Sequence, residues 1–221
     1  MPSSIFNPAT GANSPVDGYV QHDIAGTAGG TWAALRDAAG NAASATAGDG
    51  TELVWLAAGT DSDRWNYITR GVFLFDLSSL VGATITAATF EVYVTSKINN
   101  LGGSHEVALV SSAPAANNAL ASTDYPSLGT TKFATNLTIA GISTSAYNAW
   151  VLDATGLAAL SAGVVKLGLR LEKDRADTPP TWSSAAEAGI VGQYADGTNK
   201  PKLTVTYTTP STGETGFAYF M

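Results

Sequence analysis

Cysteine is absent from the 221-residue chain. Without thiols the chain forms no disulfide, holds no cysteine-ligated zinc or iron–sulfur cluster, and offers no thiol nucleophile. Charge is also scarce: only 13% of residues are charged, and 11 Lys and Arg against 18 Asp and Glu leave a net charge of −7. Binding a nucleic-acid backbone requires a basic surface. We therefore expect no nucleic-acid partner.

Long apolar runs are missing as well. No stretch approaches the ~20 apolar residues of a membrane-spanning helix, so we expect no membrane span. Residues 1–8 have neither a basic segment nor an apolar segment of the kind found in a secretory signal peptide. We expect either a leader that has been removed or release by another route, such as packaging into a virus particle.

The residues that are present favour β structure. Hydrophobic residues make up 45% of the chain, which excludes a disordered composition. Apolar and polar residues alternate over 83–96, 164–171 and 202–208, and 70–76 is nearly all apolar. A short helix is predicted over 32–40, with Thr31 as its N-cap and Gly40 ending it, and a turn of helix is predicted over 155–160. We expect an all-β fold, an antiparallel β-sandwich of jelly-roll type with this short helical insertion near the N-terminus.

The chain divides into three parts. Residues 1–17 are polar and rich in turn-forming residues, and they predict an extended N-terminal arm. Residues 18–208 predict one sandwich domain, because no linker separates two apolar cores. Residues 209–221 form a C-terminal tail beyond the last predicted strand. Within the domain, 111–136 and 173–199 are predicted to be long loops.

Several segments resemble the DNRLRE-type jelly-roll module of bacterial surface and polysaccharide-associated proteins. The matching segments are RGVFLFDLSSLVGATITAATFEVYV at 70–94, WVLDAT at 150–155 and PKLTVTY at 201–207. The resemblance covers roughly 60–208 and implies a jelly-roll fold that binds polysaccharide or builds surface assemblies. The chain departs from the family pattern at 124–129 and over 18–50, which looks like an insertion or a different first strand. The tryptophan-containing helical segment is similar to segments carried in phage-type genomes.

Two carboxylates stand close together in a predicted loop. Asp61 and Asp63 are two residues apart in the segment GTDSD. Oxygen-rich loops suit Ca²⁺, which takes six to eight oxygen ligands. A structural calcium ion is therefore a hypothesis, and the alternative is an ordinary solvated turn. No other cofactor is predicted.

Aromatic residues near strand ends are the main candidates for ligand binding. Arg64, Trp65, Asn66 and Tyr67 combine aromatic faces with a guanidinium and an amide, as glycan binding requires. Trp182 follows two prolines and is a second candidate. The alternative is that Trp55 and Trp65 close the ends of the sandwich core.

No catalytic residues are assigned. His22 and His105 lie in no recognisable nucleophile motif, and no G-x-S-x-G occurs. Glycoside hydrolysis needs two carboxyl groups about 5–9 Å apart, and nothing in the sequence marks a pair among the acidic candidates Asp61, Asp63, Glu91, Asp153, Glu172 and Asp174. We therefore expect a protein that is not an enzyme.

The two ends of the chain carry large apolar residues. Ile5 and Phe6 lie in the N-terminal arm, and Phe217, Tyr219 and Phe220 lie in the tail. Exposed apolar side chains mark interaction surfaces, so we expect one or both ends to dock on a neighbouring chain. The alternative is that the tail folds back on its own domain.

Together these features favour a non-enzymatic structural or decoration protein of a virus (phage) particle or surface assembly. Its jelly-roll module would face outward, be anchored by its terminal arms, form a homo-oligomer and bind host glycans. The expected location is the virion surface, or else the cell surface. The alternative function is a carbohydrate-binding module of a secreted bacterial surface protein, and a glycan-cleaving enzyme is the third hypothesis.

Overall fold

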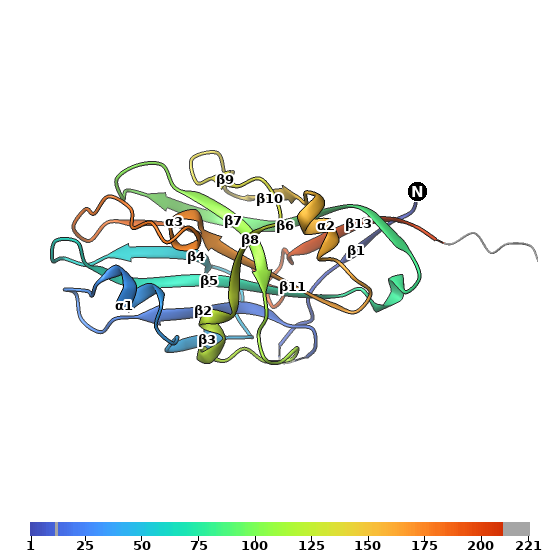
Figure 1. Ribbon diagram of the computed structural model, residues 1–221, viewed down its shortest axis with the longest axis horizontal. Coiled ribbons are helices and arrows are strands. Elements are labelled where there is room, and N and C mark those ends of the chain that lie inside the picture. The colour runs from blue at the N-terminus through green and yellow to red at the C-terminus, as the bar shows by residue number, and fades with distance from the viewer. Residues whose placement is uncertain (12, 210–221) are drawn as a thin grey trace, which may run out of the picture.

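The computed structural model describes residues 1–11 and 13–209 of the chain. Short helical segments join the strands (Figure 1): α1 (Trp32–Arg36), η1 (Ser78–Leu80), η2 (Ser122–Ser127), α2 (Ala154–Ala158) and α3 (Glu172–Arg175). The strands are β1 (Ser3–Phe6), β2 (Asp17–Asp23), β3 (Ala42–Ser44), β4 (Thr51–Ala58), β5 (Trp65–Asp76), β6 (Thr84–Asn99), β7 (Glu106–Ser112), β8 (Leu128–Lys132), β9 (Leu137–Thr138), β10 (Ala146–Val151), β11 (Val164–Leu171), β12 (Glu187–Gly192) and β13 (Lys202–Thr208).

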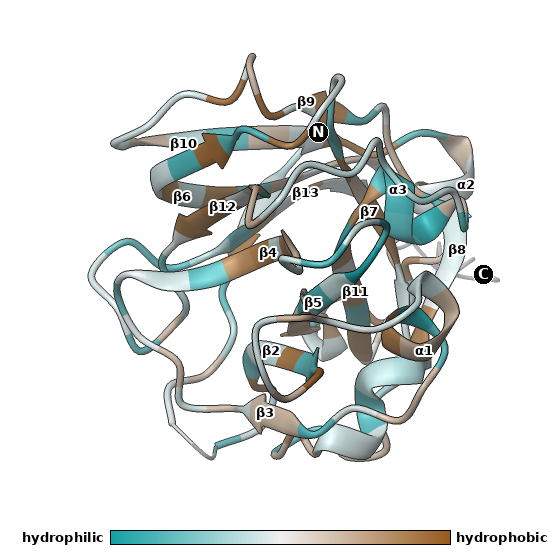
Figure 2. Cartoon of the chain, turned by 90° about the vertical axis from the view of Figure 1, so that its left-hand side faces the viewer, coloured by the Kyte–Doolittle hydropathy of each residue, from teal (hydrophilic) through white to brown (hydrophobic). Residues whose placement is uncertain are grey.

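All strand pairs are antiparallel, in the order β1-β13-β6-β12-β4-β5-β11-β7-β8. The long strands β5 and β6 each pair with several partners, and the sheet curves so that these two strands face each other (Figure 2). Phe90 of β6 packs on Phe73 and Phe75 of β5, with ring centroids 5.0 and 6.0 Å apart. The expected all-β antiparallel sandwich is confirmed, and the jelly-roll connectivity stays a prediction.

The alternating pattern of β6 is confirmed in the packing. Ala88, Phe90, Val92 and Val94 are buried on one face. In β11 the predicted apolar face is buried too, but Arg170 on its other face is only 3% exposed. The reason is a second packing layer. η2 and β8 cover this face of β11, which the alternation predicted to be solvated, together with the adjoining face of β5.

Four strands lie in segments for which the sequence predicted a loop, an insertion or a different first strand. β2 and β3 form in the segment interpreted as an insertion or a different first strand, and β8 and β12 form within the predicted loops 111–136 and 173–199. The helix is capped by Thr31 as predicted, since its Oγ1 accepts a hydrogen bond from Ala34 N at 3.2 Å. It ends at Arg36 rather than at Gly40. Gly40 instead allows close packing, because a Cβ there would lie 2.4 Å from the Ser122 carbonyl oxygen.

The N-terminal segment lies against its own domain. β1 pairs with β13 through Ser3–Thr206 to Phe6–Leu203, and the Phe6 side chain packs against the core. Ile5 points away and is 62% exposed. The predicted extended arm is therefore, over these four residues, an edge strand of the sandwich.

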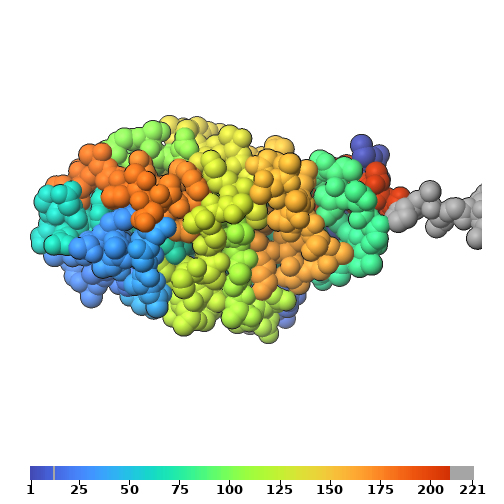
Figure 3. Space-filling view, viewed as in Figure 1, coloured from blue at the N-terminus to red at the C-terminus, as the bar shows by residue number. Residues whose placement is uncertain are grey.

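A buried ion network fixes the helical segments to the sheet at one end of the molecule, where α1 and the α3 region adjoin (Figure 3). The Asp174 carboxylate accepts two hydrogen bonds from Arg70 of β5 and two from Arg170 of β11, at 2.7–2.9 Å. Arg70 also lies over the Tyr125 ring, 3.7 Å from its centroid. Burial alone would raise the pKa of Asp174, but the two guanidinium groups outweigh it and hold that pKa well below its ordinary value.

Over residues 1–11 and 13–209, no helix has the length and apolar character needed to cross a membrane.

Candidate functional site

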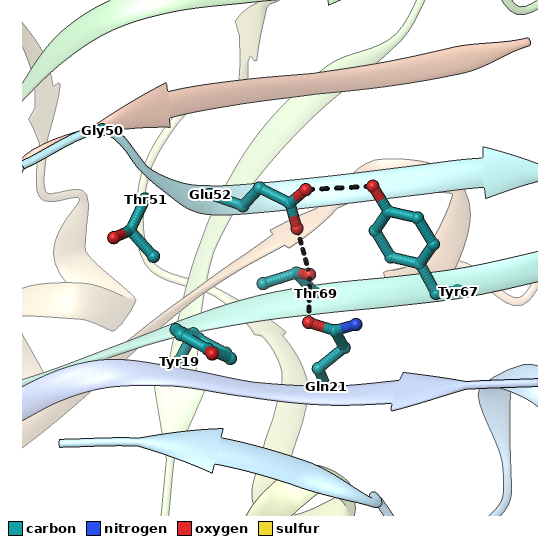
Figure 4. Close-up of a pocket in the computed structure, with 7 residues that line it drawn as sticks. All are labelled: Tyr19, Gln21, Gly50, Thr51, Glu52, Tyr67 and Thr69. Carbon is teal, nitrogen blue, oxygen red and sulfur yellow. Dashed lines mark hydrogen bonds between the residues drawn. The ribbon is translucent and has the colours of Figure 1, made fainter.

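A polar groove of about 420 Å³ opens along β2, β5 and the start of β4 (Figure 4). β2 contributes Tyr19 and Gln21, and β5 contributes Tyr67 and Thr69. The segment that opens β4 contributes the remaining lining residues, which are Gly50, Thr51 and Glu52. The groove therefore combines two tyrosine rings with hydroxyl, amide and carboxylate groups.

The alternation of β5 places the groove beside the core. Tyr67, Thr69, Gly71 and Phe73 project to one face of the strand, because successive residues alternate between faces. At Phe73 this face is covered by Phe90 and by Tyr194, which stacks on Phe73 with centroids 5.5 Å apart. Towards Tyr67 the same face is open and lines the groove.

Gly71 lies opposite Tyr19 in the ladder between β2 and β5. A Cβ at this position would lie 2.7 Å from the Leu53 carbonyl oxygen and 2.9 Å from the Phe73 ring. Only glycine lets β4 approach so closely here. The position opposite Tyr19 therefore carries no side chain, because the close packing of β4 against β5 leaves no room for one.

Glu52 is the centre of the hydrogen bonds in the groove. Its Oε1 accepts from the Tyr67 hydroxyl at 2.9 Å, and its Oε2 accepts from the Thr69 hydroxyl at 2.8 Å. The Thr69 hydroxyl also lies 3.4 Å from Gln21 Oε1. These contacts fix the carboxylate, and each of its oxygens keeps one lone pair for a further donor.

The groove has a negative electrostatic character. Burial raises the pKa of Glu52, against the lowering effect of its bonds to Thr69 and Tyr67. Burial also raises the pKa of the Tyr67 hydroxyl, and the charges of Glu52, Glu187 and Asp23 raise it further. Every charged group that shifts the Tyr67 pKa is thus a carboxylate, and no lining residue is Lys or Arg.

The indole of Trp55 borders the groove on β4. Trp55 pairs directly with Thr69, so both side chains leave the sheet on the same face. The indole lies over Gly189 of β12, where a Cβ would be 2.5 Å from Trp55 Cε3. Its Nε1 points to Glu187 Oε1 at 3.4 Å. A half-buried aromatic surface therefore continues the groove towards β12.

The predicted aromatic cluster is only partly in this groove. Tyr67 lines it, whereas Trp65 is 2% exposed and packs edge-on against Trp32, so its ring faces are covered by protein. Arg64 is exposed, and Asn66 is half-buried. Trp182 packs partly against the core and is not a lining residue. The structure does not bring Trp65, Tyr67 and Trp182 onto one surface.

Asp61 and Asp63 lie in an exposed turn before β5. Asp63 has a φ of 56°, the left-handed conformation that Asp tolerates in turns. Among residues 1–11 and 13–209 there is no group of three or more His, Asp or Glu side chains placed to hold a metal ion. The calcium hypothesis stays a prediction that rests on these two residues alone.

The other acidic candidates have structural partners. Glu91 lies 3.5 Å from Lys202, and Glu172 is bonded to Arg175. The Asp153 carboxylate caps α2 by accepting from Gly156 N at 2.9 Å. Asp174 belongs to the buried arginine network described above.

The residues predicted to dock on neighbours fall in two places. Ile5 is exposed on β1, and Phe6 packs on its own core. Phe217, Tyr219 and Phe220 lie outside the described residues. Docking by either end stays a prediction.

Sequence reasoning missed Tyr19, Gln21, Glu52 and Trp55 as members of one site. The available signal was the alternation of polar or aromatic residues with apolar residues in YVQ at 19–21 and in YITR at 67–70. It could not be used, because 18–50 was interpreted as an insertion or a different first strand, and only strand pairing brings these segments together.

No protein-family model matches the chain, and no curated protein sequence matches it. The resemblance to DNRLRE-type modules therefore stays a prediction, while the fold and the groove rest on the structure itself.

Proposed function

We propose that this chain is a non-enzymatic glycan-binding β-sandwich module. The observation that carries the proposal is the groove in which the Tyr19 and Tyr67 rings flank a fixed Glu52 carboxylate. Sugar rings have apolar C–H faces and a rim of hydroxyl groups. Tyrosine rings complement the faces, while carboxylate, amide and hydroxyl groups complement the rim.

The fixed geometry of the groove residues supports a role in ligand binding. Glu52, Tyr67 and Thr69 hold one another before any ligand arrives. They stand on paired strands, which position side chains more accurately than loops do. Little conformational entropy remains to be lost on binding.

The test is a glycan array followed by calorimetry on the glycans that bind. Tyr19→Ala removes one aromatic face and is expected to weaken binding about three- to tenfold. Tyr147→Ala is the matched control, since Tyr147 lies on β10 against Tyr93 and Lys202, away from the groove. If no glycan binds the folded protein, the proposal is wrong.

A second candidate function is a component of a virus particle or other surface assembly, displaying the groove to host glycans. One row of residues across four strands favours it: Ile5, Thr204, Thr89 and Val151 are successive cross-strand partners on β1, β13, β6 and β10. Ile5 and Val151 are 62% and 68% exposed. Contiguous exposed apolar patches mark protein interfaces, and Ile5 and Val151 are the exposed apolar members of this row.

A further inference from the structure

We infer that the groove selects uncharged glycans and rejects acidic ones. This inference rests on the proposed glycan-binding function and names the ligand class of the same site. Glu52 is the only formally charged residue among the seven that line the groove, and Glu187 lies beside the Trp55 indole that continues it.

The contacts of Glu52 show that its charge is not neutralised by the protein. Its two oxygens accept from hydroxyl groups of Tyr67 and Thr69, which carry no positive charge. No salt bridge to Glu52 or to Glu187 exists over residues 1–11 and 13–209. An anionic sugar in the groove would therefore meet an uncompensated carboxylate at close range.

Burial increases the effect of that charge. Like charges a few ångströms apart repel more strongly in a partly desolvated groove than in water. The charges of Glu52, Glu187 and Asp23 all raise the pKa of Tyr67, which also indicates a negative potential in the groove. A neutral glycan avoids this repulsion, and its hydroxyl groups can donate to the free lone pairs of Glu52.

The experiment compares neutral oligosaccharides (gluco-, manno- and N-acetylglucosamine oligomers) with uronate-containing, sialylated and sulfated oligosaccharides at low ionic strength. We expect at least one neutral series to bind, and we expect the acidic probes to bind at least about tenfold more weakly. Wild-type protein that binds acidic probes as well as or better than neutral ones would overturn this inference and leave the proposed function standing. Binding of no glycan at all would instead overturn the proposed function.

A charge-removing variant tests the assigned residues. The double variant Glu52→Gln with Glu187→Gln removes both negative charges. Because a Gln side chain has one acceptor oxygen where Glu52 uses two, neutral binding should weaken as well. The expected readout is therefore the ratio of affinities, in which acidic probes should gain relative to neutral ones. Asp61→Asn is the matched control, because it removes one carboxylate from an exposed turn outside the groove. A folded double variant without that relative gain for acidic probes would overturn the role given to the two carboxylates. If the double variant does not fold, the wild-type comparison alone decides.

Discussion

At the scale of single residues, burial acts on carboxyl groups in opposite ways according to their partners. Asp174 is fully buried between two guanidinium groups and stays charged. Asp17 is 1% exposed, its Oδ2 accepts from Ala195 N, and its Oδ1 has no hydrogen-bond partner within the described part of the chain. Burial raises the pKa of Asp17 to about 8, despite the opposing bond from Ala195. At neutral pH one of these carboxyl groups is thus ionised and the other protonated.

Asp17 makes stability depend on pH in a defined direction. Its folded-state pKa lies above the ordinary value of 3.8, so the folded state binds the proton more tightly than the unfolded state. The free energy of unfolding that this group contributes is full below about pH 4 and is lost as the pH rises towards 8. Asp17→Asn keeps the acceptor for Ala195 without an ionisable group. We expect it to be more stable than wild type at pH 9 by at least about 1 kcal/mol.

Chemical denaturation at pH 5 and pH 9 measures this effect. Asp61→Asn serves as the control, since Asp61 is exposed in a turn. An equal loss of stability between the two pH values in wild type and in Asp17→Asn would contradict the prediction.

Removing Asp174 should be far more costly. Asp174→Ala leaves the Arg70 and Arg170 guanidinium groups buried and without their carboxylate partner. Breaking a buried ion pair from one side costs about 3–5 kcal/mol. Glu172→Ala, which removes the partly exposed pair with Arg175 and a hydrogen bond from Asn136, should cost only about 1 kcal/mol. Urea denaturation curves of the two variants make the comparison, and similar midpoints would contradict it.

At the scale of elements, the groove depends on the contact between β4 and β12. Gly189→Ala would place a methyl group 2.5 Å from the Trp55 ring and 2.6 Å from the Val54 carbonyl oxygen. We expect a loss of about 1–3 kcal/mol in stability, a shifted tryptophan fluorescence spectrum and weaker glycan binding. Gly48→Ala is the control, because no atom lies within 4 Å of a Cβ there. A spectrum and affinity unchanged in Gly189→Ala would show that the indole does not depend on this packing.

The sequence predicted the strands in which the alternation of apolar and polar residues matches the burial of one face in the structure. β6, β11 and β13 were recognised because each has an apolar face turned to the core. β12 was not recognised, because its sequence EAGIVG has two glycines and no clear alternation, and its place is set by β4 and β6 on either side. The sequence predicted both Tyr67 and Trp65 as site residues, and nothing in it indicated that only Tyr67 would line the groove. A register shift between Ala57 and Ala58 accompanies the change from a buried Trp65 to a groove-lining Tyr67.

At the scale of the whole molecule, two surfaces of the sandwich have different chemistry. The groove on β2, β4 and β5 is polar and acidic. The row on β1, β13, β6 and β10 consists of two threonines between the exposed Ile5 and Val151. Among residues 1–11 and 13–209, β1 is also an edge strand that pairs on one side only, and such edges readily pair with another chain. An assembly that uses the β1 face leaves the groove free for a ligand.

Self-association therefore gives the last prediction. If the β1 face joins copies of the chain, Ile5→Lys with Val151→Lys places two charges in the contact and should turn the assembly into monomers, because burying unpaired charge is costly. Light scattering over a range of concentrations measures the mass, and Val81→Lys is the control, as Val81 is 77% exposed but is not part of the row. Both substitutions lie on an exposed face, so thermal stability and glycan affinity should remain unchanged. An assembly that persists in the double variant, or a wild-type protein that is monomeric at every concentration, would show that the row is not the contact between copies.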